Sequence, residues 1–134
     1  AGEPTKATDD AGEVILLVDA DLTIGTDKLF TGIAAADSNE VAATAGYADL
    51  YVPLPDVKWE IAPKTAGTVN TQSEIDALIG EHYIIDLTSS KFTMDTAGAT
   101  GANNAFIIVG GNPDRDKVHF RVRLDASGLG RGNV

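Results

Sequence analysis

Hydrophobic and polar positions alternate along several short segments of this chain. The alternation is clearest near the C-terminal end, in the set Val118, Phe120, Val122 and Leu124. Successive side chains of a strand point to opposite faces of a sheet, so this pattern predicts a strand with one buried face. Further strands are predicted over residues 14–18, 28–33, 47–54, 57–61, 83–87, 92–94 and 106–109. The run 106–109 (FIIV) is apolar throughout and predicts burial on both faces, and GGNPD (110–114) predicts a turn after it.

A single short helix interrupts this pattern of strands. The residues TQSE (71–74) fit a capping box, in which the threonine caps an amide and the glutamate reaches back. Apolar residues follow at helical spacing, and Gly80 is a suitable terminator. We therefore expect a helix over about residues 73–79, within an all-β fold that is either a small barrel or a sandwich.

The remaining organisation follows from the two ends of the chain. Residues 1–13 are polar and lack apolar periodicity, which predicts an extended N-terminal arm. Residues 126–134 are rich in glycine, which predicts a flexible tail. A chain of 134 residues suits one domain, so residues 14–125 are predicted to form a single β domain.

Composition excludes several classes of function. The chain contains no cysteine, which rules out disulfides, thiolate metal sites and a cysteine nucleophile. Its net charge of -10 argues against a nucleic-acid partner and against an anionic membrane surface. No apolar run approaches the roughly 18 residues of a membrane-spanning helix.

The sequence also lacks recognisable catalytic and cofactor-binding motifs. Neither His82 nor His119 lies in a recognisable motif, and the acidic loop at residues 19–27 lacks the bidentate glutamate of a calcium loop. No phosphate-binding glycine motif occurs. We expect no catalytic residue, no cofactor and no metal. A small hydrolase or isomerase would need a pocket that joins one of these histidines to a carboxylate.

Three surface features remain as candidates for binding. The basic row Lys117, His119, Arg121 and Arg123 is either a solvated strand face that balances nearby carboxylates or a docking strip for an acidic partner or a neighbouring subunit. Pro53 lacks an amide donor, so Pro53 and Pro55 predict a strand edge or bulge and a contact between subunits. Trp59 is the largest apolar anchor of its strand, but it could also stack on a sugar with Tyr51. That option leaves a carbohydrate-binding β-sandwich module of a virion or secreted protein as the alternative function.

Five segments together resemble a known family. They are VILLV (14–18), YADLYVPLPDVKWEI (47–61), SEIDALIGEHYIIDL (73–87), AFIIVGG (105–111) and KVHFRVR (117–123). Their pattern is similar to that of the small decoration (cement) proteins of tailed-bacteriophage capsids. In that family an apolar strand near the start is followed by a V-x-L-x-x-x-x-W-E-I-like run. A glycine before Y-x-x-D-L and a final arginine-bearing strand complete the pattern.

The resemblance implies a small β-barrel or tulip-like domain on the outer surface of a virion. It implies the major capsid protein as the partner, a homo-oligomer with a trimer favoured over a dimer, and stabilisation of the expanded head without enzymatic activity. Extended arms of the family clamp adjacent capsid proteins. The matching arm residues here are Glu3, Pro4, Thr5 and Lys6.

Overall fold

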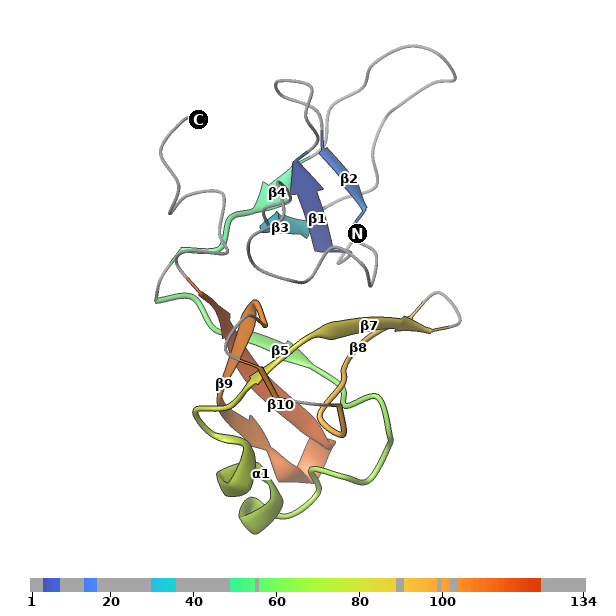
Figure 1. Ribbon diagram of the computed structural model, residues 1–134, viewed down its shortest axis with the longest axis vertical. Coiled ribbons are helices and arrows are strands. Elements are labelled where there is room, and N and C mark those ends of the chain that lie inside the picture. The colour runs from blue at the N-terminus through green and yellow to red at the C-terminus, as the bar shows by residue number, and fades with distance from the viewer. Residues whose placement is uncertain are drawn as a thin grey trace.

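The computed structural model describes residues 4–7, 14–16, 30–35, 49–54, 56–88, 91–98, 100–101 and 104–123. Within these residues the chain forms antiparallel strands and one α-helix, so the predicted all-β fold with one short helix is confirmed. The strands fall into an N-terminal sheet and a C-terminal group that surrounds the main hydrophobic core (Figure 1).

The N-terminal sheet contains four strands in the order β2-β1-β3-β4. Their bounds are Pro4–Ala7 (β1), Val14–Leu16 (β2), Phe30–Ala34 (β3) and Leu50–Tyr51 (β4). The strand β1 pairs with β2 on one side and with β3 on the other. The arm predicted over residues 1–13 is therefore extended at Pro4–Ala7, but it is a paired strand there and not a free arm. Glu3 and the predicted tail at 126–134 lie outside the described residues.

The C-terminal group contains six strands. They are Trp59–Ile61 (β5), His82–Tyr83 (β6), Ile85–Thr88 (β7), Lys91–Met94 (β8), Phe106–Asn112 (β9) and Lys117–Val122 (β10). Four of them form a sheet in the order β5-β10-β9-β6, and β7 and β8 form a hairpin. The predicted strand at 83–87 is thus divided at Ile84 into β6 and β7.

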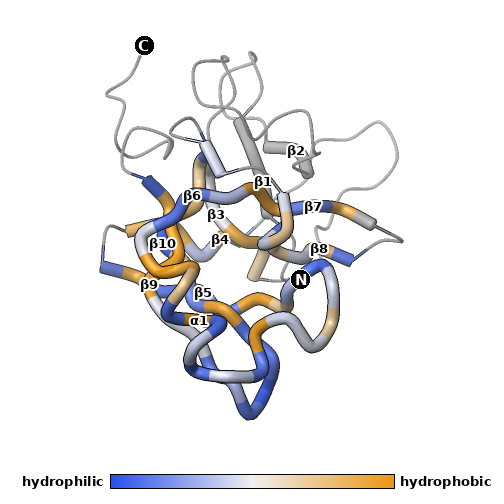
Figure 2. Tube along the Cα trace, turned by 60° about the horizontal axis from the view of Figure 1, so that its bottom comes forward, coloured by the Kyte–Doolittle hydropathy of each residue, from blue (hydrophilic) through white to orange (hydrophobic). Residues whose placement is uncertain are grey.

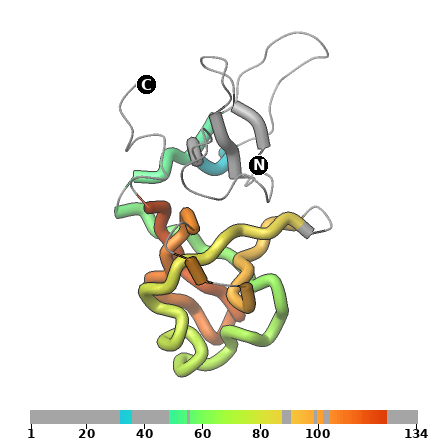
Figure 3. The backbone as a smooth tube through the Cα atoms, viewed as in Figure 1, coloured from blue at the N-terminus to red at the C-terminus, as the bar shows by residue number. Residues whose placement is uncertain are grey.

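Backbone hydrogen bonds close this group into a ring, as the continuous trace of Figure 3 helps to follow. The segment that carries β6 and β7 pairs with β9 through its first half and with β8 through its second. The amide of Met94 donates to the carbonyl of Ala62 at 2.9 Å, and the amide of Lys64 donates to the carbonyl of Met94 at 2.8 Å. Since Ala62 directly follows β5, these bonds join β8 to β5 and complete a small barrel.

The alternation that predicted the last strand is confirmed by its burial. Val118, Phe120 and Val122 of β10 are buried, and the residues between them are half-buried. The rings of Phe120 and Phe106 meet edge-to-face with centroids 5.3 Å apart. Figure 2 shows hydrophobic positions on the barrel strands, interrupted by hydrophilic ones.

The neighbouring strand β9 differs from its prediction. Phe106 and Ile108 are buried, but Ile107 and Val109 are only half-buried, so burial on both faces is wrong for this run. The turn predicted at 110–114 begins later than expected, because residues 110–112 continue β9 and only Pro113 and Asp114 lie in the turn. The turn is made instead by the 3₁₀ segment Pro113–Arg115 (η2) and by Asp116.

The helix Gln72–Leu78 (α1) explains why β9 carries glycine at that point. Both hydrogen bonds of the predicted capping box are present between Thr71 and Glu74, and Gly80 has the positive φ of a helix terminator. Ile75 is fully buried, and a Cβ added to Gly111 would lie 2.8 Å from its Cδ1. Glycine at 111 therefore lets the helix pack directly on the inner face of β9.

Candidate docking surface

The barrel wall β5-β10-β9-β6 has a second face, which points away from the core. Opposite residues of an antiparallel pair share one face of the sheet. Glu60 is opposite His119, Ile107 is opposite Arg121, and His82 is opposite Ile107. We call this surface the outer face. It comprises Glu60, His82, Ile107, Lys117, His119 and Arg121, together with Lys58, which the register of β5 and β10 places next to Arg121.

The predicted basic row lies on this outer face. Lys117, His119 and Arg121 occupy alternate positions of β10. Arg123 follows directly, and its amide donates to the carbonyl of Ala105 at 2.9 Å, which continues the pairing beyond the last residue of the strand. The structure therefore brings the four residues into one line along the wall.

One acidic residue balances part of this charge. The carboxylate of Glu60 contacts Nη1 of Arg115 at 2.9 Å and Nε2 of His119 at 3.1 Å. Glu60 is the only acidic residue that the described strands place on the outer face. One interpretation of the basic row is that it balances nearby carboxylates. This interpretation applies to His119, which contacts Glu60.

Three further cations, Lys58, Lys117 and Arg121, differ from His119 in this respect. Within the described part of the chain, no ion pair involves Lys58, Lys117 or Arg121. The Nε of Arg121 is buried and has no hydrogen-bond partner. A buried donor without an acceptor is costly, since water no longer replaces the missing bond. This face thus carries a local positive surplus on a chain whose net charge is -10.

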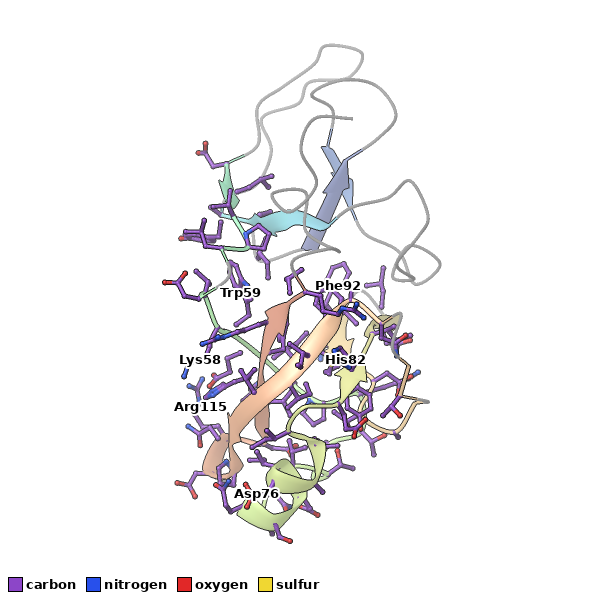
Figure 4. All side chains as sticks on the ribbon, turned by 60° about the vertical axis from the view of Figure 1, so that its left-hand side comes forward. Lys58, Trp59, Asp76, His82, Phe92 and Arg115 are labelled. Carbon is purple, nitrogen blue, oxygen red and sulfur yellow. The ribbon has the colours of Figure 1, made fainter. Side chains whose placement is uncertain are left out.

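Two of these cations lie beside each other. Phe120 is paired with Trp59, so the next position in register brings Lys58 next to Arg121 on the outer face. Like charges at directly opposite positions of two strands are destabilising. Figure 4 shows that Lys58 and Arg115 extend from the same side of the molecule. Sequence reasoning missed Lys58 and Arg115 because strand pairing, which no local pattern reveals, brings them to this surface.

A cavity of about 420 Å³ lies at one end of the outer face. Its lining residues are Glu81, His82, Thr100, Gly101 and Arg123. The loop before β9 is held beside it, because the side-chain amide of Asn104 donates to the carbonyl of His82 at 3.0 Å.

The lining of this cavity includes a histidine, an acidic residue and a threonine, which are residue types that a hydrolase or isomerase would need. No hydrogen bond or ion pair connects the three side chains. The residue types are therefore present without the base–nucleophile contact that activates a hydroxyl.

The other predicted contacts are placed differently. Pro4, Thr5 and Lys6 lie in β1, between two strands. The strand β4 is an edge strand, as predicted from the proline that follows it, and Pro53 itself is buried. Pro55 lies outside the described residues. Around Pro53 the side chains of Tyr51, Val52 and Leu54 are 60%, 44% and 49% exposed.

Trp59 is packed against the hydrophobic core, as predicted for an anchor residue. Its ring centroid is 6.4 Å from that of Tyr51, and the two ring planes are inclined at 60°. A sugar ring stacks on a flat and exposed aromatic surface, whereas these two rings are not coplanar and Trp59 is partly covered. The pair therefore offers no shared stacking platform.

Two polar groups that sequence reasoning did not single out serve the fold. Asp116 has a left-handed conformation (φ 49°), and its carboxylate accepts from the amides of Gly67 at 2.6 Å and Val69 at 3.1 Å. It thereby ties the loop before α1 to the β9–β10 turn. The NPDRD segment (112–116) signalled a turn former, but nothing local signals a bond across almost fifty residues.

Lys64 is the second of these groups. Its Nζ contacts the buried Asp86 at 3.2 Å and Asp95 at 3.4 Å, at the point where β8 joins the chain after β5. The hydrogen bond to Asp86 is the main cause that raises the pKa of Lys64. Burial opposes it, and the charges of Asp95 and Asp86 add to the rise.

The described residues hold no group of three or more histidine, cysteine, aspartate or glutamate side chains that could bind a metal ion. The one α-helix among them is too short and too polar to cross a membrane. Neither a protein-family model, nor a curated protein sequence, nor a solved structure matches this chain.

Proposed function

We propose that this chain is a non-enzymatic structural protein of a virion, which binds the outer surface of a bacteriophage capsid and stabilises the expanded head. The observation that carries the proposal is the outer face, a cationic surface on an acidic chain. Its sign is opposite to that of the molecule, so it attracts an acidic partner. The sequence resemblance to decoration proteins supplies the identity of the partner, the major capsid protein.

The physical basis of the proposed stabilisation is preferential binding. A ligand that binds the assembled shell, and not its separated subunits, stabilises the shell by mass action. Many copies on one shell also act together, so a modest affinity per site is sufficient. A cationic face with few internal ion pairs suits this role, because its charges need not be released from other contacts before binding.

We propose the outer face, and not the N-terminal arm, as the main contact with the capsid. Pro4–Ala7 would have to leave both β2 and β3 before it could clamp a capsid protein. We therefore place the main contact on the outer face and give the residues Glu3–Lys6 a secondary role. The exposed apolar residues at Tyr51–Leu54, beside Pro53 and Pro55, are proposed as the contact between copies, with a trimer favoured over a dimer.

Co-sedimentation with expanded, undecorated capsids tests this function. We expect saturable binding at a fixed ratio to the major capsid protein, and capsids that resist heating better when the protein is bound. Absence of binding by folded protein would overturn the proposal. Deletion of residues 1–10 is a poor test, because it removes β1 from the middle of a sheet.

The alternative of a carbohydrate-binding module depends on Tyr51, which is the exposed aromatic side chain among the described residues. Binding of a glycan that is lost in Tyr51→Ala, together with no binding to capsids, would favour this alternative. The packing of Trp59 against the core favours the capsid protein as the partner.

A further inference from the structure

We infer that the outer face binds an extended acidic segment of the partner protein, which crosses the strands and carries two acidic side chains on either side of an apolar one. This inference refines the docking contact of the proposed function. The partner is defined by its chemistry alone, and the binding can be tested without a capsid.

The geometry of the outer face defines the pattern. Lys58, Arg121, Ile107 and His82 lie on neighbouring chain segments, in that order across the wall. Adjacent strands are about 4.8 Å apart, so this row is about 14 Å long. An extended peptide covers the same distance in four residues at about 3.4 Å each. Residues i, i+2 and i+4 of such a segment face the same side, which gives the pattern acid-x-apolar-x-acid.

Each position of the segment has a counterpart on the row. One carboxylate lies between Lys58 and Arg121, where it separates two like charges and forms charge-assisted contacts with both cations. The apolar side chain packs on the half-buried Ile107. The second carboxylate reaches the cavity of about 420 Å³, whose lining of Glu81, His82, Thr100, Gly101 and Arg123 holds one cation, Arg123, and one carboxylate, Glu81.

Charge and shape favour a protein segment over a nucleic acid. The net charge of -10 opposes a polyphosphate chain as a whole, whereas a short segment with two carboxylates meets only the local positive field. The apolar Ile107 at the middle of the row also needs a side chain that buries it. Glu60 does not compete for the cations of the row, because Arg115 and His119 already occupy its carboxylate.

The test uses the full-length protein and a capped heptapeptide, Gly-Glu-Ala-Leu-Ala-Glu-Gly. Calorimetry gives the affinity, and amide chemical-shift changes locate the site. We expect shifts at Lys58, Ile107 and Arg121, and binding at least tenfold weaker for the peptide with glutamine in place of both glutamates. Arg121→Gln and the exposed Lys58→Gln are each expected to weaken binding at least tenfold. Lys91→Gln, which makes the same charge change on β8 away from the face, should leave binding unchanged.

Several outcomes would overturn the inference. The glutamine peptide could bind as tightly as the glutamate peptide, or Lys91→Gln could lose as much peptide affinity as Arg121→Gln. The amide chemical-shift changes could be confined to other strands, or a single-stranded oligonucleotide could bind more tightly than the peptide. Lys58→Gln keeps the test decisive if Arg121→Gln fails to fold.

Co-sedimentation of the same variants separates this inference from the proposed function. Capsid binding that survives Lys58→Gln and Arg121→Gln would overturn the inference alone. Peptide binding without capsid binding would overturn the function alone.

Discussion

The two faces of strand β10 differ in how completely their side chains are partnered. Val118, Phe120 and Val122 point into the barrel and are enclosed by other apolar residues. Lys117, His119 and Arg121 point outward, and of these only His119 has an ionic partner within the described residues. One strand thus carries the stability of the fold on its even-numbered residues and a surface available for recognition on its odd-numbered ones.

Polar residues elsewhere in the barrel sharpen this difference. Asp116 and Lys64 each bind groups from distant parts of the chain, and each lies where two segments must be held together. Within the described residues, by contrast, no ion pair involves Lys58, Lys117 or Arg121. A polar residue that serves the fold is therefore recognised by its partners, and a polar residue left without partners is a candidate for binding.

The largest effect on stability is expected from Phe120→Ala. The side chain is buried and meets Phe106 edge-to-face, so its removal leaves a cavity in the middle of the core. Such substitutions lower the free energy of unfolding by about 3–5 kcal/mol. Urea denaturation measures the change. The matched variant His119→Ala, next to it on the other face, should lose less than about 1 kcal/mol, because it removes a single surface contact, the one between His119 and Glu60. Equal losses in the two variants would show that the faces do not differ as described.

A smaller loss is expected from Asp116→Ala. This change removes the acceptor of two amides and places alanine at a positive φ, so we expect the free energy of unfolding to fall by about 1–3 kcal/mol. Asp116→Asn should lose less, because asparagine tolerates this conformation and keeps one acceptor oxygen. Asp114→Ala, in the same turn but exposed, should change stability by no more than about 0.5 kcal/mol. A loss in Asp114→Ala as large as in Asp116→Ala would contradict the assigned role.

The sequence was informative wherever structure depends on neighbouring residues. The alternation around Phe120 and the capping box at Thr71 are local patterns, and both predictions are confirmed. The structure at the predicted arm and at the predicted turn depends instead on segments that are distant in the sequence. Pro4–Ala7 forms β1 because β2 and β3 flank it, and Gly110 continues β9 because the next residue lies beneath Ile75. The four members of the basic row were placed correctly in one line along the wall, but Lys58 joins them only through strand pairing.

Alkaline pH should weaken the fold by a smaller amount. Burial, assisted by the charge of Glu81, raises the pKa of Tyr83, and the hydrogen bond to Asp86 raises the pKa of Lys64. Both groups hold their protons more tightly in the folded state. Their contribution to stability is therefore fully present below pH ~10 and is lost as pH rises through the raised pKa values.

Urea denaturation between pH 8 and pH 11 tests this expectation. The midpoint should fall above pH ~10, and Tyr83→Phe should reduce the slope of the fall. A midpoint that rises with pH in this range would contradict the assignment of both groups.

The smallest effect on stability is expected from Lys58→Gln, although this variant should impair binding strongly. Lys58 is exposed and has no ionic partner in the described part of the chain, and the register of β5 and β10, continued by one residue, brings it next to the cation Arg121. Removal of one of two like charges on adjacent strands should raise the free energy of unfolding by about 0.2–0.5 kcal/mol at low salt. The gain should disappear near 1 M salt, where exposed charges are screened within about 3 Å.

A loss of more than about 1 kcal/mol would place Lys58 among the residues that serve the fold. A gain in stability with a loss of peptide binding would show that the outer face retains a repulsive pair at a cost to folding, which is the behaviour expected of a surface whose partner is another protein.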